Sequence, residues 1–234
     1  MRLKKISFIL IVVLLLEAAG CATYKQTKID VRPVGEYSSV RTAEGISVAL
    51  DPYDSAEEAK HGFQRDVTRE GFVPVNLIVR NDTDENVRIN RDKIELIDEN
   101  GVIYRPVSSK AMFEKFKIDA FGRLAALSII SIWVGALSYI SAKRANRKME
   151  ADWQRKEIPD HLIIPPKSRI HGFVYFRLPE GETTVSQLRL ESERMSTRKK
   201  VQIEITPSDS QSLITISPVQ EENPAERSLT GPNV

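Results

Sequence analysis

Few residues in this chain of 234 residues have side chains suited to catalysis, and none falls into a catalytic or metal-binding pattern. The three histidines, His61, His161 and His171, are far apart, and neither an HExxH nor a CxxC motif occurs. No glycine-rich phosphate loop and no Gly-x-Ser-x-Gly elbow is present. His171 lies in an apolar stretch, where we expect a structural histidine of the core. We therefore expect no enzymatic activity, no cofactor and no metal; a catalytic site assembled only by the fold is the weaker alternative.

Cys21, the only cysteine, is the one residue whose chemical fate the sequence predicts. A basic start over residues 1–5 precedes an apolar run over residues 6–16, and small residues follow. This pattern is too short for a comfortable membrane span and predicts a signal peptide over residues 1–20, with cleavage between Gly20 and Cys21. The sequence Ala-Ala-Gly-Cys at this point resembles the lipobox of bacterial lipoproteins. The alternative is an ordinary secretory signal followed by a coincidental cysteine.

The lipobox resemblance implies that the thiol of Cys21 receives a diacylglycerol and that Cys21 becomes the new N-terminus. It therefore implies a location in the bacterial cell envelope, with the membrane as a partner. Ala22, rather than an aspartate, follows the cysteine. In an organism with two membranes, this residue indicates the periplasmic face of the outer membrane.

The charge balance argues against a nucleic-acid partner. The formal net charge is +2, and residues 1–20 hold three basic residues against one acidic residue. Removal of the signal peptide therefore leaves a formally neutral chain, whereas nucleic-acid binding requires a basic face.

Alternating apolar residues predict short strands in two separate parts of the chain, residues 45–107 and 158–206. The stretch at 72–79 places four apolar residues on one face, and the stretch at 170–178 is apolar on both faces, as in a strand buried between layers. The Asn100-Gly101 pair favours a two-residue hairpin. Roughly seven to nine strands at this spacing predict a mainly β fold, an immunoglobulin-like antiparallel β-sandwich.

The segments that flank the predicted sandwich are polar. Residues 21–44 show no sustained periodicity, and we expect a tether between the lipid and the folded domain. Residues 207–234 are rich in Ser, Pro, Glu and Asn, and we expect a disordered tail.

A helical insert over about residues 108–158 interrupts the predicted sandwich. Residues 124–142 contain no charged side chain, and Lys143-Arg144 follows them directly. The stretch is long enough to cross a bilayer, but it is also suited to lying on a membrane or to packing on protein. A single crossing would put the two strand regions on opposite sides of the membrane, so we favour membrane-adjacent or partner packing. The residues expected to make these contacts are Leu127, Ile130, Trp133, Val134, Leu137, Lys143, Arg144, Arg147 and Lys148. The basic members suit anionic headgroups, and the alternative is a solvated helix face paired with Glu150 and Asp152.

Several stretches together resemble a group of largely uncharacterised bacterial envelope lipoproteins. They are Gly-Phe-Val-Pro-Val at 71–75, Ile-Glu-Leu-Ile-Asp-Glu-Asn-Gly at 94–101, Ile-Pro-Pro at 164–166 and His-Gly-Phe-Val-Tyr-Phe at 171–176. The resemblance implies an immunoglobulin-like domain similar to telokin-like domains, interrupted by an apolar helical insert. It carries over no catalytic residues.

From these observations we expect a lipid-anchored envelope protein that acts as a non-catalytic binding or structural module. The insert is its expected membrane-adjacent or partner-binding element. The alternative is an accessory subunit of an envelope complex, whose insert packs with the membrane helices of a partner protein.

Overall fold

The computed structural model describes residues 23–128, 132–179 and 185–207. The predicted signal peptide, Gly20, Cys21, Ile130 and nearly all of the predicted tail lie outside these residues. The strands are β1 Val40–Ala43, β2 Ile46–Pro52, β3 Phe72–Asn81, β4 Val87–Asn90, β5 Glu95–Ile97, β6 Ile103–Tyr104, β7 His161–Ile164, β8 Ser168–Arg177, β9 Gln187–Arg194 and β10 Lys200–Ile205. The α-helices are α2 Ala56–Phe63, α3 Ser109–Phe116, α4 Ala120–Ser128 and α5 Ile132–Lys156, and the 3₁₀ turns are η1 Val34–Glu36, η2 Thr68–Glu70 and η3 Arg91–Lys93.

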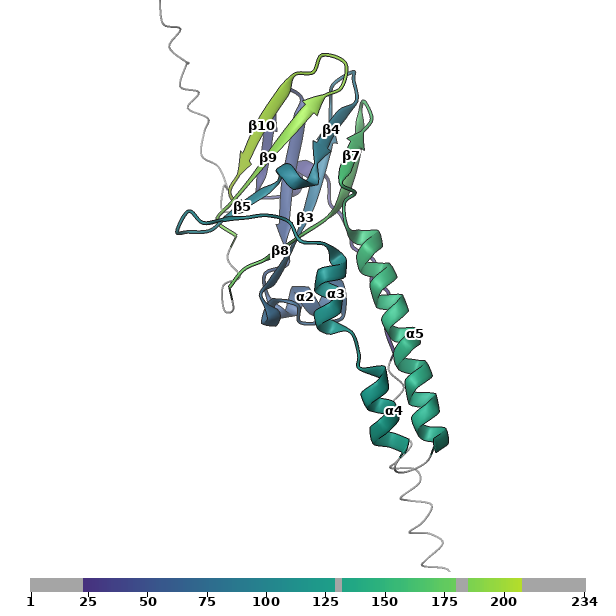
Figure 1. Ribbon diagram of the computed structural model, residues 1–234. Helices are drawn as coiled ribbons and strands as arrows, with labels where there is room; N and C mark the ends of the chain where they lie inside the picture. The colour runs from purple at the N-terminus through teal and green to yellow at the C-terminus, as the bar shows by residue number, and fades with distance from the viewer. Residues whose placement is uncertain (1–22, 129–131, 180–184, 208–234) are drawn as a thin grey trace, which may run out of the picture.

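Two antiparallel sheets form the body of the protein (Figure 1), which confirms the predicted mainly β, antiparallel architecture. The first sheet has the order β1-β2-β3-β8. In the second sheet β9 pairs with β10 and also with both β5 and β4, and β6 and β7 extend the sheet beyond β5 and β4. In each strand with an alternating pattern, the apolar side chains lie on one face of the sheet, because successive side chains point to opposite faces.

The pairing of β3 with β8 excludes a single membrane crossing by the insert. These strands pair over their full length, from Phe72 opposite Arg177 to Asn81 opposite Ser168. β3 precedes the insert and β8 follows it, so a single crossing would separate two strands that are neighbours in one sheet. Among the described residues, the structure contains no helix long and apolar enough to cross a membrane.

The main core lies between the two sheets. The alternating residues of β3, Val73, Val75, Leu77 and Val79, are all at most 1 % exposed and belong to one apolar cluster with residues of the second sheet. Strands β4, β5, β9 and β10 contribute every second residue to the same cluster, for example Leu188 and Leu190 of β9. Burial of these side chains, at roughly 25 cal/mol per Å² of apolar surface, holds the sheets together.

A second core lies on the other face of the first sheet, where helices cover it. Val174 and Phe176 of β8 point to the main core, whereas Phe173 and Tyr175 pack with Phe63 of α2 and Trp153 of α5. The rings meet edge to face at centroid distances of 5.0 to 6.0 Å, the arrangement that aromatic quadrupoles favour. This double burial is what the two-sided apolar pattern of residues 170–178 predicts.

Three helices, α3, α4 and α5, make up the insert, and its base is fixed to β8 and to η3. The backbone of Val107 donates to Tyr175 at 2.8 Å, and that of Ile158 donates to Phe173 at 3.0 Å. The carboxylate of Glu157 accepts hydrogen bonds from Ser109 and forms an ion pair with Arg91. The insert therefore leaves and re-enters the sheets at one place.

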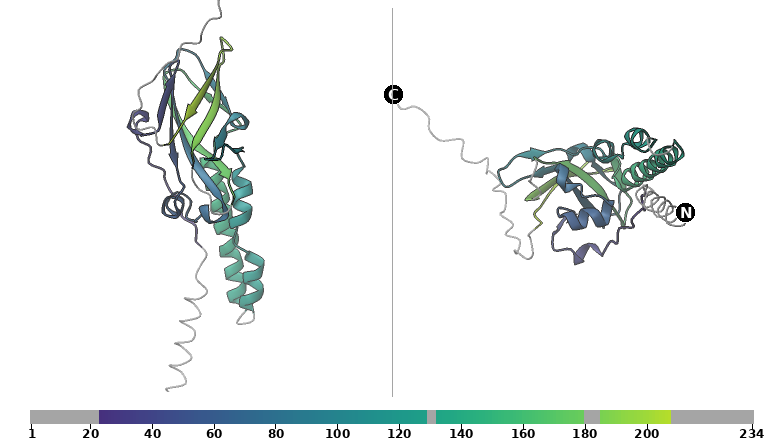
Figure 2. Two further views of the ribbon diagram at one scale, coloured as in Figure 1. Left: turned by 90° about the vertical axis from the view of Figure 1, so that its left-hand side faces the viewer. Right: turned by 90° about the horizontal axis from the view of Figure 1, so that it is seen from below.

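Residues 23–43 pack against the body, which contradicts the predicted tether. The segment runs along the outer side of the first sheet (Figure 2, left), where Val34 and Tyr37 cover Ala49 and Ile78 in a third apolar cluster. It ends as β1, the edge strand beside β2. The sequence pattern failed here because only isolated apolar residues, separated by charged ones, make these contacts.

The turn at Asn100-Gly101 is also longer than predicted. β5 and β6 pair at Leu96–Tyr104 and at Ile97–Ile103, so the connection spans more than two residues. The carboxylate of Asp98 accepts hydrogen bonds from the backbone of Asn100 at 2.9 Å and of Val102 at 2.8 Å. This carboxylate closes the loop and replaces the two-residue turn that the Asn-Gly pair favours.

Candidate functional site

The candidate functional site is the helical hairpin formed by α4 and α5. The two helices lie side by side and project away from the sheets, and the C-terminal end of α4 and the N-terminal end of α5 lie at the end of the molecule opposite the β9–β10 turn (Figure 1). The amide of Asn146 in α5 fixes the segment before α4, because it donates to the carbonyl of Ile118 at 2.8 Å and accepts from its N–H at 2.8 Å. The hairpin is therefore attached to the helical layer at a defined place.

The described side chains of helix α5 divide into a buried side and an exposed side. One side is buried and contains small residues near the tip and larger ones toward the body. The buried residues of this side are Gly135, Ser138, Ala142, Ala145, Met149 and Trp153. The recurring small residues that invite close approach of another helix are therefore already used inside this chain, where α4 lies alongside α5.

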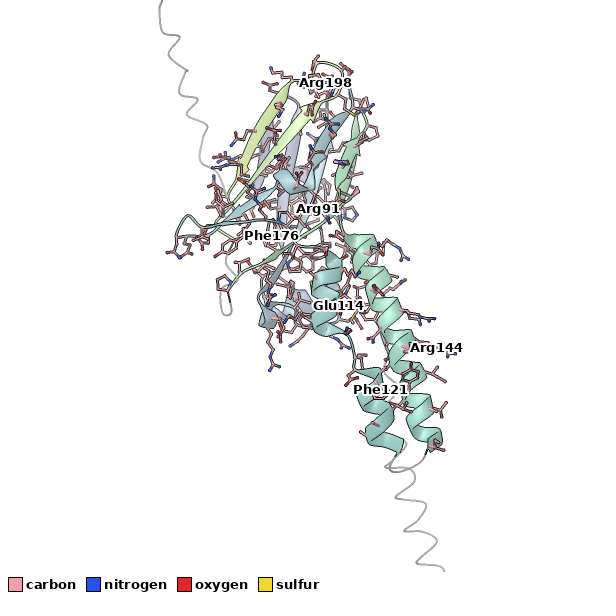
Figure 3. The ribbon with its side chains drawn as sticks, in the orientation of Figure 1. Arg91, Glu114, Phe121, Arg144, Phe176 and Arg198 are labelled. Atoms are coloured by element: carbon pink, nitrogen blue, oxygen red, sulfur yellow. The ribbon has the colours of Figure 1, made fainter. Side chains whose placement is uncertain are left out.

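The other side of α5 is exposed, and it changes from apolar to basic along the helix. Ile132, Leu137 and Ile140 are 71, 68 and 45 % exposed, and Phe121 on α4 is 72 % exposed. The following two turns of the same side hold exposed Lys143, Arg144, Arg147 and Lys148. Figure 3 shows Phe121 and Arg144 on the two helices, far from Arg198 at the sheet end.

The four basic residues Lys143, Arg144, Arg147 and Lys148, here called the basic cluster, form no ion pair with any described residue. The ammonium of Lys143 lies 5.2 Å from the ring centre of Tyr139. Pairing with Asp152, the alternative considered from the sequence, is wrong, because Asp152 is buried and pairs with Lys156 at 2.6 Å. The cluster therefore keeps its full positive charge available at the surface.

The structure describes the side chains of only some of the predicted contact residues. Leu137 and the basic cluster are exposed on one side of α5. Leu127 belongs to α4, and Trp133 and Val134 belong to α5, but their side chains lie outside what is described, as does Ile130 entirely. Gly20 and Cys21 precede the first described residue. The assignment of these residues to membrane or partner contact stays a prediction.

A buried polar cluster joins the N-terminal segment to α5, and it was not predicted from the sequence. The hydroxyl of Tyr24 donates to Asp152 at 2.7 Å and accepts from the indole N–H of Trp153 at 3.0 Å. The ammonium of Lys156 donates to Asp152, to Thr27 at 2.8 Å and to the carbonyl of Gly62 at 2.7 Å. We call this cluster, Tyr24, Thr27, Asp152, Trp153 and Lys156, the N-terminal clamp.

Burial governs the protonation of the clamp. It lowers the pKa of Lys156 below its usual range, and the hydrogen bond from Lys156 to Asp152 opposes this effect. Burial also raises the pKa of the Tyr24 phenol, and Asp152 adds to the rise.

Two tyrosines outside the clamp are affected in the same way. Burial raises the pKa of Tyr53 to about 12 and that of Tyr175 well above the usual value. These three residues, Tyr24, Tyr53 and Tyr175, are called the buried phenols below.

The clamp sets where the chain arrives at the hairpin. Thr23 and Tyr24 line a groove of about 360 Å³ together with Leu137, Ile140 and Arg144 of α5. The first described residue therefore lies against the exposed side of α5, at the boundary between its apolar and basic parts. The spacing of Asp152 and Lys156 indicates an ion pair on a helix, but no feature of the sequence identifies Tyr24 as their partner.

The histidines do not form a site. His161 contacts Asn90 on the second sheet at 2.9 Å, and His61 lies on α2. His171 is exposed on the outer face of β8, so the expectation of a core histidine is wrong. Partial burial and Arg169 lower its pKa. In the described parts of the chain, no group of three or more His, Cys, Asp or Glu residues is arranged to hold a metal ion.

The fold and site together define a class: a two-sheet antiparallel β protein with a helical insertion between strands of the second sheet. No family model matches the chain, and no curated protein sequence matches it. One solved structure to which the chain is similar is that of the yjhA protein from Bacillus subtilis, at 10 % identity. The match covers 71 % of this chain and 95 % of that one with a TM-score of 0.32, a level that carries no argument about fold or function.

Proposed function

We propose that this chain is a lipid-anchored protein of the bacterial cell envelope that works without catalysis, as a binding or structural module. Its two-sheet body is an immunoglobulin-like sandwich, and the helical hairpin is its interaction element. The lipid is carried by Cys21 after removal of residues 1–20. In an organism with two membranes, the protein resides on the periplasmic face of the outer membrane.

One observation supports this proposal above all: the N-terminal clamp holds Thr23 against the exposed side of α5. Two residues of extended chain reach at most about 7 Å, so a lipid on Cys21 enters the membrane close to the hairpin. An anchor attached through a free tether would give the hairpin no fixed relation to the bilayer. In this proposal the anchor lies beside the exposed apolar side chains of the hairpin, Phe121, Ile132, Leu137 and Ile140, and the sheets lie farther from the membrane.

The subunit alternative, in which the hairpin packs with membrane helices of a partner, has less support. Close packing against a partner helix needs exposed small residues, and Gly135, Ser138 and Ala142 of α5 are buried within the chain itself. The exposed side of α5 instead carries long apolar and basic side chains.

The proposal is tested by growing cells that express the chain with a radioactive fatty acid. Wild type incorporates label and migrates as the chain lacking residues 1–20, and Cys21→Ser incorporates none. A Ser39→Ala variant serves as the matched control, because it changes a hydroxyl in the same N-terminal region and keeps Cys21. Absence of label in wild type, with the leader removed, refutes the anchor and supports an ordinary secretory signal.

A further inference from the structure

We propose that the exposed apolar part of α5, formed by Ile132, Leu137 and Ile140, inserts into one leaflet of an anionic bilayer, with the basic cluster at the level of the lipid headgroups. This inference deepens the proposed function, on which it rests for the bilayer to which Cys21 is anchored. It identifies the partner of the exposed side of α5 as lipid rather than protein.

The dimensions of the hairpin fit a single leaflet. Ile132 to Ile140 span about 12 Å along a helix that rises 1.5 Å per residue, and Lys143 follows about 5 Å later. One leaflet contributes about 15 Å of the roughly 30 Å hydrocarbon core. The uncharged part of α5 therefore ends at the depth where the headgroups begin, without crossing the bilayer.

The order of side chains along α5 matches the order of layers in a membrane. Exposed Ile132, Leu137 and Ile140 come first, and the basic cluster begins directly after them on the same side of the helix. Because no described carboxylate pairs with the cluster, its charges are available to lipid phosphates. The acidic residues of α5 lie nearer the body: Asp152 is buried in the clamp, and Glu150 is exposed beyond the cluster.

The path of the chain gives the same orientation independently. Thr23 lines the groove with Leu137, Ile140 and Arg144, at the boundary between the apolar and basic parts of α5. A lipid attached two residues earlier would enter the bilayer at the level where the basic cluster meets the headgroups. Anchor and hairpin would then form two contacts with one surface.

The test uses the chain from residue 21 to residue 234 with Cys21→Ser, which lacks both the leader and the lipid but keeps every described residue. It is mixed with vesicles of phosphatidylcholine containing phosphatidylglycerol, or with vesicles of phosphatidylcholine alone, and the bound fraction is measured by co-sedimentation. The chain is expected to bind the anionic vesicles and to be released as salt is raised, because screening weakens contacts with the headgroups.

Matched variants separate the apolar contact from the electrostatic one. Leu137→Ser with Ile140→Ser lowers partitioning at least about tenfold. The control Val102→Ser with Ile103→Ser changes side chains that are 49 and 51 % exposed at the start of β6, and it leaves partitioning unchanged. Arg144→Gln with Lys148→Gln lowers binding to anionic vesicles roughly fivefold per charge. The control Lys199→Gln with Lys200→Gln removes the same charge at the sheet end and has little effect.

Three results would overturn the inference. The first is no binding of the parent chain to either kind of vesicle. The second is equal loss of binding in the Val102/Ile103 control, which would show non-specific adsorption. The third is a dimer, seen by sedimentation equilibrium without lipid, that Leu137→Ser with Ile140→Ser dissociates; a second copy would then cover the hairpin. Because this chain has no lipid, vesicle binding succeeds or fails independently of fatty-acid labelling at Cys21.

Discussion

Removal of a single hydroxyl, in Tyr24→Phe, tests the N-terminal clamp. The change deletes the 2.7 Å hydrogen bond to the buried carboxylate of Asp152 and leaves the indole N–H of Trp153 without its acceptor. A hydrogen bond to a charged group contributes about 1.5 to 3 kcal/mol, and an unsatisfied buried donor costs about 1 to 3 kcal/mol. Because the two effects share one hydroxyl, we expect the free energy of unfolding to fall by about 2 to 4 kcal/mol.

The assay for Tyr24→Phe is urea denaturation at neutral pH, followed by far-ultraviolet circular dichroism and by tryptophan fluorescence. Tyr37→Phe is the matched control, because within the described residues the Tyr37 hydroxyl makes a single hydrogen bond, which it accepts from the backbone N–H of Arg32 at 3.1 Å. The control should lose about 1 kcal/mol or less. A Tyr24→Phe loss no larger than that of Tyr37→Phe would refute the clamp and with it the fixed exit of the N-terminus beside α5.

Three further predictions concern the core, the backbone and pH. Phe63→Ala removes a fully buried ring and should lower the free energy of unfolding in urea by about 3 to 5 kcal/mol. Phe121→Ala, at a position that is 72 % exposed, should lower it by less than about 0.5 kcal/mol. Equal losses would contradict the arrangement of the helical layer. Gly71→Ala should destabilise by more than Gly101→Ala, since both glycines have positive φ but only at Gly71 would a new Cβ meet a backbone oxygen, that of Leu178. Thermal unfolding that ranks the two variants in the opposite order would contradict this. The folded state holds the protons of the buried phenols more tightly than the unfolded state does. The free energy of unfolding should therefore fall as pH rises above about 10, by up to about 1.4 kcal/mol per pH unit for each phenol. The lowered pKa of Lys156 has the opposite effect below about pH 10.4, because there the unfolded state binds the Lys156 proton more tightly, and it partly offsets this fall. Absorbance at 295 nm should show about half of the six tyrosines ionising only as the protein unfolds, and free ionisation of all six below the unfolding pH would refute this.

The sheets were predictable because burial imposes a period of two on their sequences. The alternation at residues 72–79 and the two-sided apolar pattern at 170–178 identify β3 and β8 and also the number of layers that cover each strand. Pairing partners are not visible in such patterns, so the junction of β3 with β8 across the insert came only from the structure.

The N-terminal segment was mispredicted for a physical reason. Tyr24, Val34 and Tyr37 are each buried, but polar or charged residues that point to solvent separate them, so no periodicity arises. Their partners are more than a hundred residues away in the case of the clamp, and a single sequence contains no signal of that distance.

The sequence predicted the composition of the hairpin but not its division into two helices. The uncharged stretch at 124–142 is visible at once, yet α4 ends at Ser128 and α5 begins at Ile132, so the stretch belongs to two helices rather than one. The basic cluster was also visible, whereas its freedom from ion pairs depends on the burial of Asp152 with Lys156.

The most direct test of the account is the membrane depth of two labelled positions in the lipidated, full-length protein. Because Cys21 is the only cysteine and is proposed to carry the lipid, a cysteine introduced by Leu137→Cys or by Ile103→Cys provides a unique thiol for an environment-sensitive fluorophore. In isolated envelope membranes, the label at position 137 is expected to show a blue-shifted emission and quenching by lipids brominated in the acyl chain. The label at position 103 should show the emission of a fluorophore exposed to water. Equal, water-like emission at both positions would contradict the proposal that the hairpin enters the bilayer beside the anchor.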